Sequence, residues 1–208
     1  MRTTIVARGL DDLGMFFRTA PEVAETAARI AINSIAGRSG MKIIRDAMFD
    51  EIAFPAGYLN TDRLAVTKRA TNKNLEAVIT GRKRATSLAR FVTGSLGVGV
   101  KSNGITVRVK KGRTEVLRRG FLVRLRRGAS VSEDNYNIGL AVRVGPGETV
   151  MGKKTTHKSW LIPGKVALLY GPSVDQVFRS VADEVAPRLG DMMGQEFLRQ
   201  FARLSGGR

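Results

Sequence analysis

The sequence predicts an α+β fold with an N-terminal helical arm, a central antiparallel β-sheet or small barrel, and a C-terminal amphipathic helix. Apolar residues recur at helical spacing in residues 21–52 and again in residues 172–204. Between these stretches, short runs alternate apolar and polar residues and are separated by glycines, which is typical of antiparallel strands with one buried face. We therefore expect three segments. Residues 1–57 hold the N-terminal arm and helices, residues 58–171 a basic antiparallel β domain, and residues 172–208 the C-terminal helix and tail.

The N-terminal helical pattern begins at Pro21, a residue favoured in the first turn of a helix. Glu22 and Glu25 follow at the positive end of the helix dipole. One face then carries an apolar stripe made of Val23, Ala27, Ile30, Ala31 and Ile35, together with Ala24 and Ala28. Glycines at positions 37 and 40 interrupt the pattern, so we expect a second helical segment over residues 41–52.

The clearest strand pattern covers residues 104–110. Ile105, Val107 and Val109 point to one side, and Thr106, Arg108 and Lys110 point to the other. Lys111-Gly112 is a turn signal, and a return strand is expected near residues 116–117. In the next strand we expect Phe121, Val123 and Leu125 to face the core, with Leu122, Arg124 and Arg126 opposite. Further strands are expected near residues 64–66, 75–79, 137–144 and 160–170.

The C-terminal helix is expected to begin after Pro172-Ser173, where Ser173 and Gln176 have the spacing of a capping box. Pro187 is expected to restart or kink this helix. Its later apolar stripe is longer than one small sheet needs. We expect that stripe either to stay in the core or to contact a neighbouring subunit, through Met192, Met193, Phe197 and Phe201.

The net charge of +17 is concentrated in the middle of the chain. Residues 63–127 contain 18 Lys/Arg and only two acids, Glu76 and Glu115. A localised cationic field indicates a polyanionic partner, with nucleic acid as the first candidate. A solvated basic surface that only maintains solubility is the alternative, although such surfaces usually mix both signs.

Catalytic, metal and cofactor chemistry is not indicated. The chain has no cysteine, His157 is its one histidine, and its acids are scattered, so we expect no metal site, no catalytic residues and no cofactor. The segment 152–155 lacks the spacing of a phosphate-binding loop. We find neither a secretory signal nor an apolar run of about 18 residues, so we expect assembly in the cytoplasm and no membrane partner.

The order of these elements resembles the minor tail protein Z (tail completion) family of lambda-like long-tailed phages. The resemblance rests on the alanine-rich helix at 22–37, the second helical segment at 41–52, the basic stretches 81–91 and 104–112, Gly-Phe-Leu at 120–122, and Leu-Tyr-Gly-Pro-Ser-Val at 169–174. The glycine-rich linker between the helices and the acidic loop Glu133-Asp134-Asn135 depart from it.

The resemblance implies a non-enzymatic structural protein at the head-proximal end of a phage tail, which completes tails and helps to seat the packaged DNA. The expected partners are the tail terminator, other neck or tail-tube proteins and phage genomic DNA. The expected location is the virion, with assembly in the host cytoplasm. Closed cyclic symmetry is usual at such sites, and we expect a homo-oligomeric ring, with a hexamer favoured.

We expect the basic block to contact the phosphate backbone without reading bases, because aromatic side chains suited to stacking are scarce there. The candidate contacts are Arg108, Lys110, Lys111, Arg113, Arg118, Arg119, Arg124, Arg126 and Arg127. A free-standing, sequence-nonspecific nucleic-acid-binding protein is the alternative function. The two differ in oligomeric state and in retention in virions.

Overall fold

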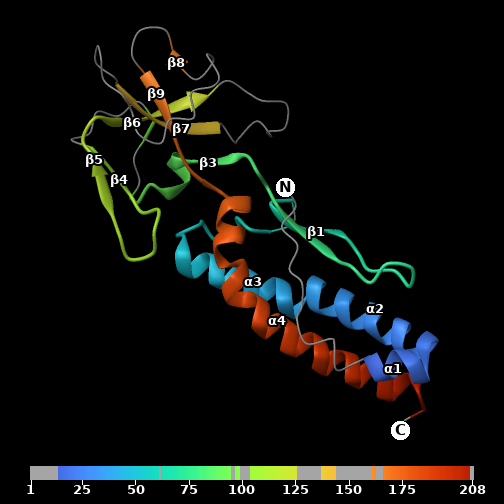
Figure 1. Cartoon of the computed structure of the whole chain (residues 1–208). Helices are drawn as coiled ribbons and strands as arrows, with labels where there is room; N and C mark the ends of the chain where they lie inside the picture. Colours follow the sequence, from blue (N-terminus) through green and yellow to red (C-terminus); the bar gives the residue numbers. More distant parts are fainter. Residues whose placement is uncertain are drawn as a thin grey trace. The chain divides into compact units, whose positions relative to one another are not determined.

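A computed structural model describes residues 14–60, 62–94, 97–98, 104–125, 137–143, 161–162 and 166–206 (Figure 1). It confirms the α+β fold, with helices near both ends and antiparallel strands between them. The chain forms two compact units, and each is built from segments that are distant in sequence. Unit 1 contains residues 1–50, 59–83 and 174–208, and unit 2 contains residues 51–58 and 84–173. The expected β segment 58–171 is thus shared between the two units.

Unit 1 is built mainly of helices: α1 (Gly14–Thr19), α2 (Pro21–Gly37), α3 (Ser39–Glu51) and α4 (Val174–Leu204). Pro21 occupies the start of α2 as expected. Ser173 directly precedes α4, and Asp175 lies in its first turn. Pro187 lies inside α4, which continues on both sides of it rather than restarting there.

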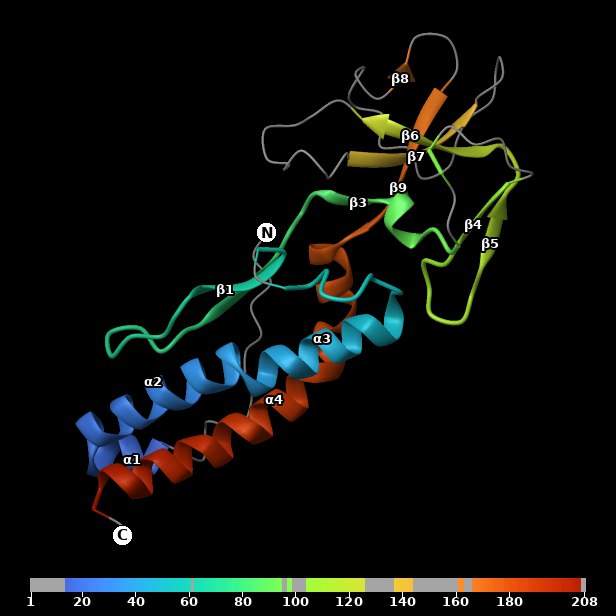
Figure 2. The same cartoon turned by 180° about the vertical axis from the view of Figure 1, so that it is seen from behind.

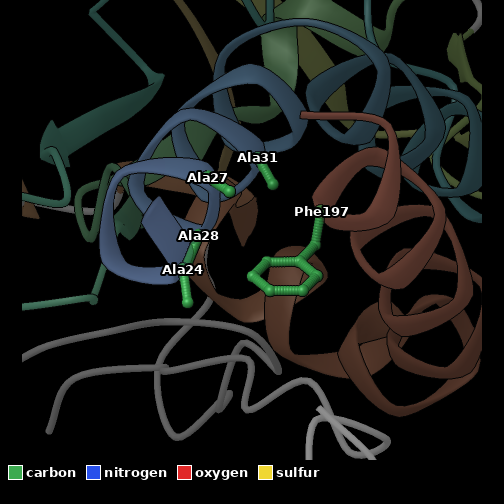
Figure 3. Packing of buried hydrophobic residues seen from close by; sticks show 5 residues of the cluster. All are labelled: Ala24, Ala27, Ala28, Ala31 and Phe197. Atoms are coloured by element: carbon green, nitrogen blue, oxygen red, sulfur yellow. The ribbon is translucent and has the colours of Figure 1, made fainter. Parts of the chain in front are cut away.

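The core between α2 and α4 combines a face of small residues with one large ring (Figure 3). Phe197 of α4 is 1% exposed, and its ring lies against the alanine face of α2. Alanine side chains are short, so the two helices can approach closely enough to enclose the ring. That alanine face consists of Ala24, Ala27, Ala28 and Ala31, and the residues packed around the cluster are Phe16, Phe17, Leu75 and Phe201.

Unit 1 also contains the antiparallel hairpin of β1 (Leu64–Lys68) and β2 (Val78–Gly81), which forms its own two-stranded sheet. The side chain of Asn33 on α2 donates to the Ala70 carbonyl at 3.0 Å and accepts from the Ala70 N–H at 2.9 Å. A Cβ added to Gly81 would lie 2.8 Å from the backbone of Asp175, so glycine allows a close approach to α4. These local contacts explain why the hairpin belongs with the helices rather than with the larger sheet.

Unit 2 contains a five-stranded antiparallel sheet in the order β3-β9-β7-β6, with β8 paired to β9. The strands are β3 (Ala85–Ser87), β6 (Gly120–Leu125), β7 (Asn137–Arg143), β8 (Leu161–Ile162) and β9 (Val166–Ser173). The 3₁₀ helix η2 (Leu88–Phe91) follows β3. β4 (Ile105–Val107) and β5 (Glu115–Leu117) form a separate two-stranded ribbon, visible from both sides in Figures 1 and 2, and an isolated bridge joins Val107 to Val92.

The core of unit 2 corrects one expectation for β6. Leu122 is 8% exposed and packs in the core, whereas Phe121, Val123 and Leu125 are half-buried on the opposite face. The register explains this orientation, because Leu122 pairs with Leu140 of β7, and Leu140 pairs with Leu169 of β9. Cross-strand partners point to the same face, so the three leucines pack together with Ile105 and Val107 of the ribbon.

No helix within the described residues is long and apolar enough to cross a membrane. The same part of the chain holds no group of three or more His, Cys, Asp or Glu side chains placed to bind a metal ion.

Candidate nucleic-acid interface

The β4–β5 ribbon is held in place by backbone hydrogen bonds at the end of β4. The Arg108 N–H donates to the Phe91 carbonyl of η2 at 2.8 Å, and the Val109 carbonyl accepts from Ala53 N–H at 2.8 Å. Lys110 forms an isolated bridge with Ile52. These bonds fix the backbone and leave the side chains of Arg108 and Lys110 exposed.

The alternation expected for residues 105–110 holds in the burial of residues 105, 107, 108 and 110, but β4 itself ends at Val107 and Val109 is half-buried. Ile105 and Val107 are buried at 2% and 4% exposure, while Arg108 and Lys110 are exposed. The turn after Lys110 contains Gly112 at φ +79°, a left-handed conformation that glycine adopts without strain. Lys111 and Arg113 are exposed in this turn.

A second group of cations lies at the opposite end of the ribbon. Arg118 and Arg119 are exposed in the short turn between β5 and β6. The Arg118 Cα lies 3.1 Å from the position of a Cβ added to Gly104, directly before β4. Three residues of strand separate this turn from the Arg113 end, a length of about 10 Å. The ribbon therefore carries cations at both ends.

The nine candidate contacts do not share one sheet face. Arg124 is exposed on β6, a strand of the five-stranded sheet rather than of the ribbon. Arg126 and Arg127 lie outside the described residues. The structure thus groups Arg108, Lys110, Lys111 and Arg113 at one end of the ribbon and Arg118 and Arg119 at the other, with Arg124 on a different ladder.

The two acids of the basic block are already paired. Glu76 accepts from Lys68 at 2.6 Å, and Glu115 forms an ion pair with Arg113 at 3.0 Å. The Arg113–Glu115 pair is exposed on both sides, so it neutralises charge locally and adds little stability. Within the described residues, Arg108, Lys110 and Arg118 make no ion pair.

The remaining titratable group of note in unit 2 is the phenol of Tyr170 on β9. Burial raises the pKa of Tyr170 above its ordinary value of 10.0, and the charge of Arg84 acts in the opposite direction. The phenol therefore stays protonated and neutral near pH 7 and does not reduce the positive charge of the unit.

Within the apolar stripe of α4, Phe197 belongs to the core of the chain itself. Phe197 is buried, and Phe201 packs on Phe16 with ring centroids 4.8 Å apart. The expected subunit contact through Phe197 is therefore corrected, because that ring fills the space between α2 and α4. Met192 and Met193 are half-buried.

Sequence reasoning missed a second cluster of cations, which lies in unit 1. Arg38, Lys42 and Arg45 line a groove of about 540 Å³ together with Arg69 of the segment after β1. The signal was present as basic residues at helical spacing i, i+4 and i+7, but the charge of this region is balanced by nearby acids in the sequence.

No family model, curated protein or solved structure matches this chain.

Proposed function

We propose that this chain is a non-enzymatic structural protein that binds the phosphate backbone of nucleic acid, and that it acts at the neck of a tailed phage. The observation that carries the binding role is the charged ribbon of unit 2. Its two ends expose cations, and its one acid, Glu115, is paired with Arg113. Exposed guanidinium and ammonium groups, such as those of Arg108, Lys110 and Arg118, attract phosphates regardless of base sequence.

The ribbon is suited to contact with the phosphate backbone of nucleic acid rather than to stacking on its bases. The ring of Phe121 is half-buried beneath the guanidinium of Arg143, whose Cζ lies 5.3 Å from the ring centroid. Phe91 is 2% exposed in the core. Neither ring is free to stack on a base, so the interaction that remains for the ribbon is charge with phosphate.

The phage neck setting and the ring rest on the resemblance to the minor tail protein Z family. In this proposal the protein joins the tail terminator and other neck or tail-tube proteins, and its basic surface is directed toward the genomic DNA. The burial of Phe197 removes one argument for a ring interface on α4, which leaves the free-standing nucleic-acid-binding protein as the second candidate.

The binding role is tested by measuring affinity for duplex DNA of unrelated sequences across a range of salt concentrations. The double variant Arg108→Gln/Arg118→Gln removes one cation from each end of the ribbon. It should reduce the slope of log affinity against log salt by about two. The matched control Arg18→Gln/Lys73→Gln removes two exposed cations from unit 1 and should leave the slope close to that of the original protein.

A flat salt response, or equal losses in the two double variants, would reject the ribbon as the contact surface. The setting is tested separately by mass spectrometry of purified virions and by native mass measurement of assembled tails. Retention in virions as a multi-copy ring supports the neck role, whereas a DNA-binding monomer absent from virions supports the free-standing alternative.

A further inference from the structure

The groove in unit 1 concentrates positive charge on one side of α3. Arg38 immediately precedes α3, and its carbonyl accepts from the Lys42 N–H at 3.1 Å, so the helical spacing already holds from residue 38. Arg38, Lys42 and Arg45 follow one another at intervals of about one turn. At a rise of about 1.5 Å per residue, they cover roughly 10 Å of the helix.

The opposite wall of the groove comes from β1 and the residues after it. In both views the β1–β2 hairpin lies alongside α2 and α3 (Figures 1 and 2). A Cβ added to Gly37 would lie 3.9 Å from Nη1 of Arg69, which places this guanidinium at the start of the cationic row. Apart from one acid, Asp46, the remaining lining is apolar and includes Met41, Phe49, Leu64, Ala65 and Val66.

The cations of the groove are not paired with acids in the part of the chain that the structure describes. Within the described residues, Arg38, Lys42, Arg45 and Arg69 make no ion pair, and Asp46 is the one acid in the lining. Cations that lie close together without an acid between them repel one another, so an anion bound in the groove would stabilise the row.

We infer that this groove is a second phosphodiester-binding site, which engages a short run of one nucleic-acid strand. The density of charge favours this ligand. Each phosphodiester of a strand carries one negative charge, so cations that follow one another along roughly 10 Å of α3 can pair with successive phosphates of one strand. The apolar floor between the cations suits sugar groups, which carry no charge.

The inference shares its ligand class with the proposed function but rests on different residues in a different unit. The two are therefore separable by experiment. The double variant Arg38→Gln/Lys42→Gln removes two exposed cations from the groove and leaves the half-buried Arg45 in place, so the fold is retained. Arg188→Gln/Arg203→Gln removes two exposed cations from α4, outside the groove, and is the matched control.

Each variant is made in the original chain and in the ribbon variant Arg108→Gln/Arg118→Gln. Affinity for a single-stranded and a duplex oligonucleotide is measured across salt concentrations. The groove variant should lower the salt slope by about two in both backgrounds, and the α4 control should not. Hydrogen-exchange mass spectrometry should show that the oligonucleotide slows exchange in residues 38–49 of the original protein and not of the groove variant.

An unchanged slope together with unchanged exchange in 38–49 would overturn the inference. If the ribbon variant still loses affinity in that case, the proposed function survives. If neither pair of substitutions affects binding, both fail. A third probe, poly-glutamate of matched length, tests whether the groove binds an acidic protein instead. Slowed exchange in 38–49 with poly-glutamate and not with oligonucleotide would overturn the inference in favour of an acidic protein partner.

Discussion

Replacing Phe197 by alanine should destabilise unit 1 strongly. Fully burying a phenylalanine side chain contributes about 1.5–3 kcal/mol, and the cavity left by its removal adds about 24 cal/mol per Å³. The ring lies against Ala24, Ala27, Ala28 and Ala31. Alanine has no alternative side-chain conformation, so these residues cannot fill the cavity. Edge contact with Phe16 at a centroid distance of 5.8 Å is lost as well. We therefore expect the upper part of the usual range for this substitution, about 4–5 kcal/mol.

The assay is urea denaturation of the purified protein, followed by its helical circular dichroism signal. The control is Leu198→Ala, the next residue along α4, which is 46% exposed and should change stability by no more than about 0.5 kcal/mol. A loss below about 1.5 kcal/mol for Phe197→Ala would refute the packing argument. A change in native mass without a change in stability would instead assign the ring to a subunit interface.

Three further outcomes concern smaller features of unit 1. Gly40→Ala should lower stability by about 1–3 kcal/mol, because its Cβ would lie 2.6 Å from the Ile35 carbonyl oxygen; an unchanged melting temperature would contradict this. Asn33→Ala should cost about 1–3 kcal/mol, since it leaves the Ala70 N–H and C=O without their side-chain partner; slower exchange at Ala70 in the variant would contradict it. The hydrogen bond from Arg199 holds the pKa of Glu196 below its ordinary value of 4.5. The ionised Glu196 carboxylate therefore stabilises the fold above pH 4.5, and this contribution is lost as the pH falls below that value. Glu196→Gln should reduce the loss of folding stability at acidic pH. Parallel curves of stability against pH for the variant and the original protein would contradict this.

The sequence predicted the elements whose residues alternate or repeat without ambiguity. Pro21 and the alanine stripe that follows it specify α2, and residues 105–117 specify the ribbon through alternation and Gly112. Such patterns depend on local geometry alone, so they are legible without knowledge of the partner elements.

The failures came where two faces of a strand are both apolar or where the partner is distant in sequence. In β6, the run Phe121, Leu122, Val123 offers apolar residues to either face, and the choice is made by pairing with Leu140. Likewise, nothing within β1 and β2 shows that their hairpin packs with helices, because the deciding contacts involve Asn33 and Asp175. The groove at Arg38 was missed because nearby acids balance the charge of Lys42 and Arg45 in the sequence, and Arg69 joins them only in the folded unit.

The alanine face of α2 and the ring that covers it are made at very different times. A ribosome adds about 5–20 residues per second, so the interval between Ala31 and Phe197 is on the order of ten seconds. During this interval α2 has no α4 to pack on, and its small-residue face stays open to water or to other nascent chains. The residues of unit 2 lie between α2 and α4 in the sequence, so synthesis of unit 2 is finished before that of unit 1. Chains that stop before α4 should therefore aggregate or require a chaperone, even though their sheet is intact.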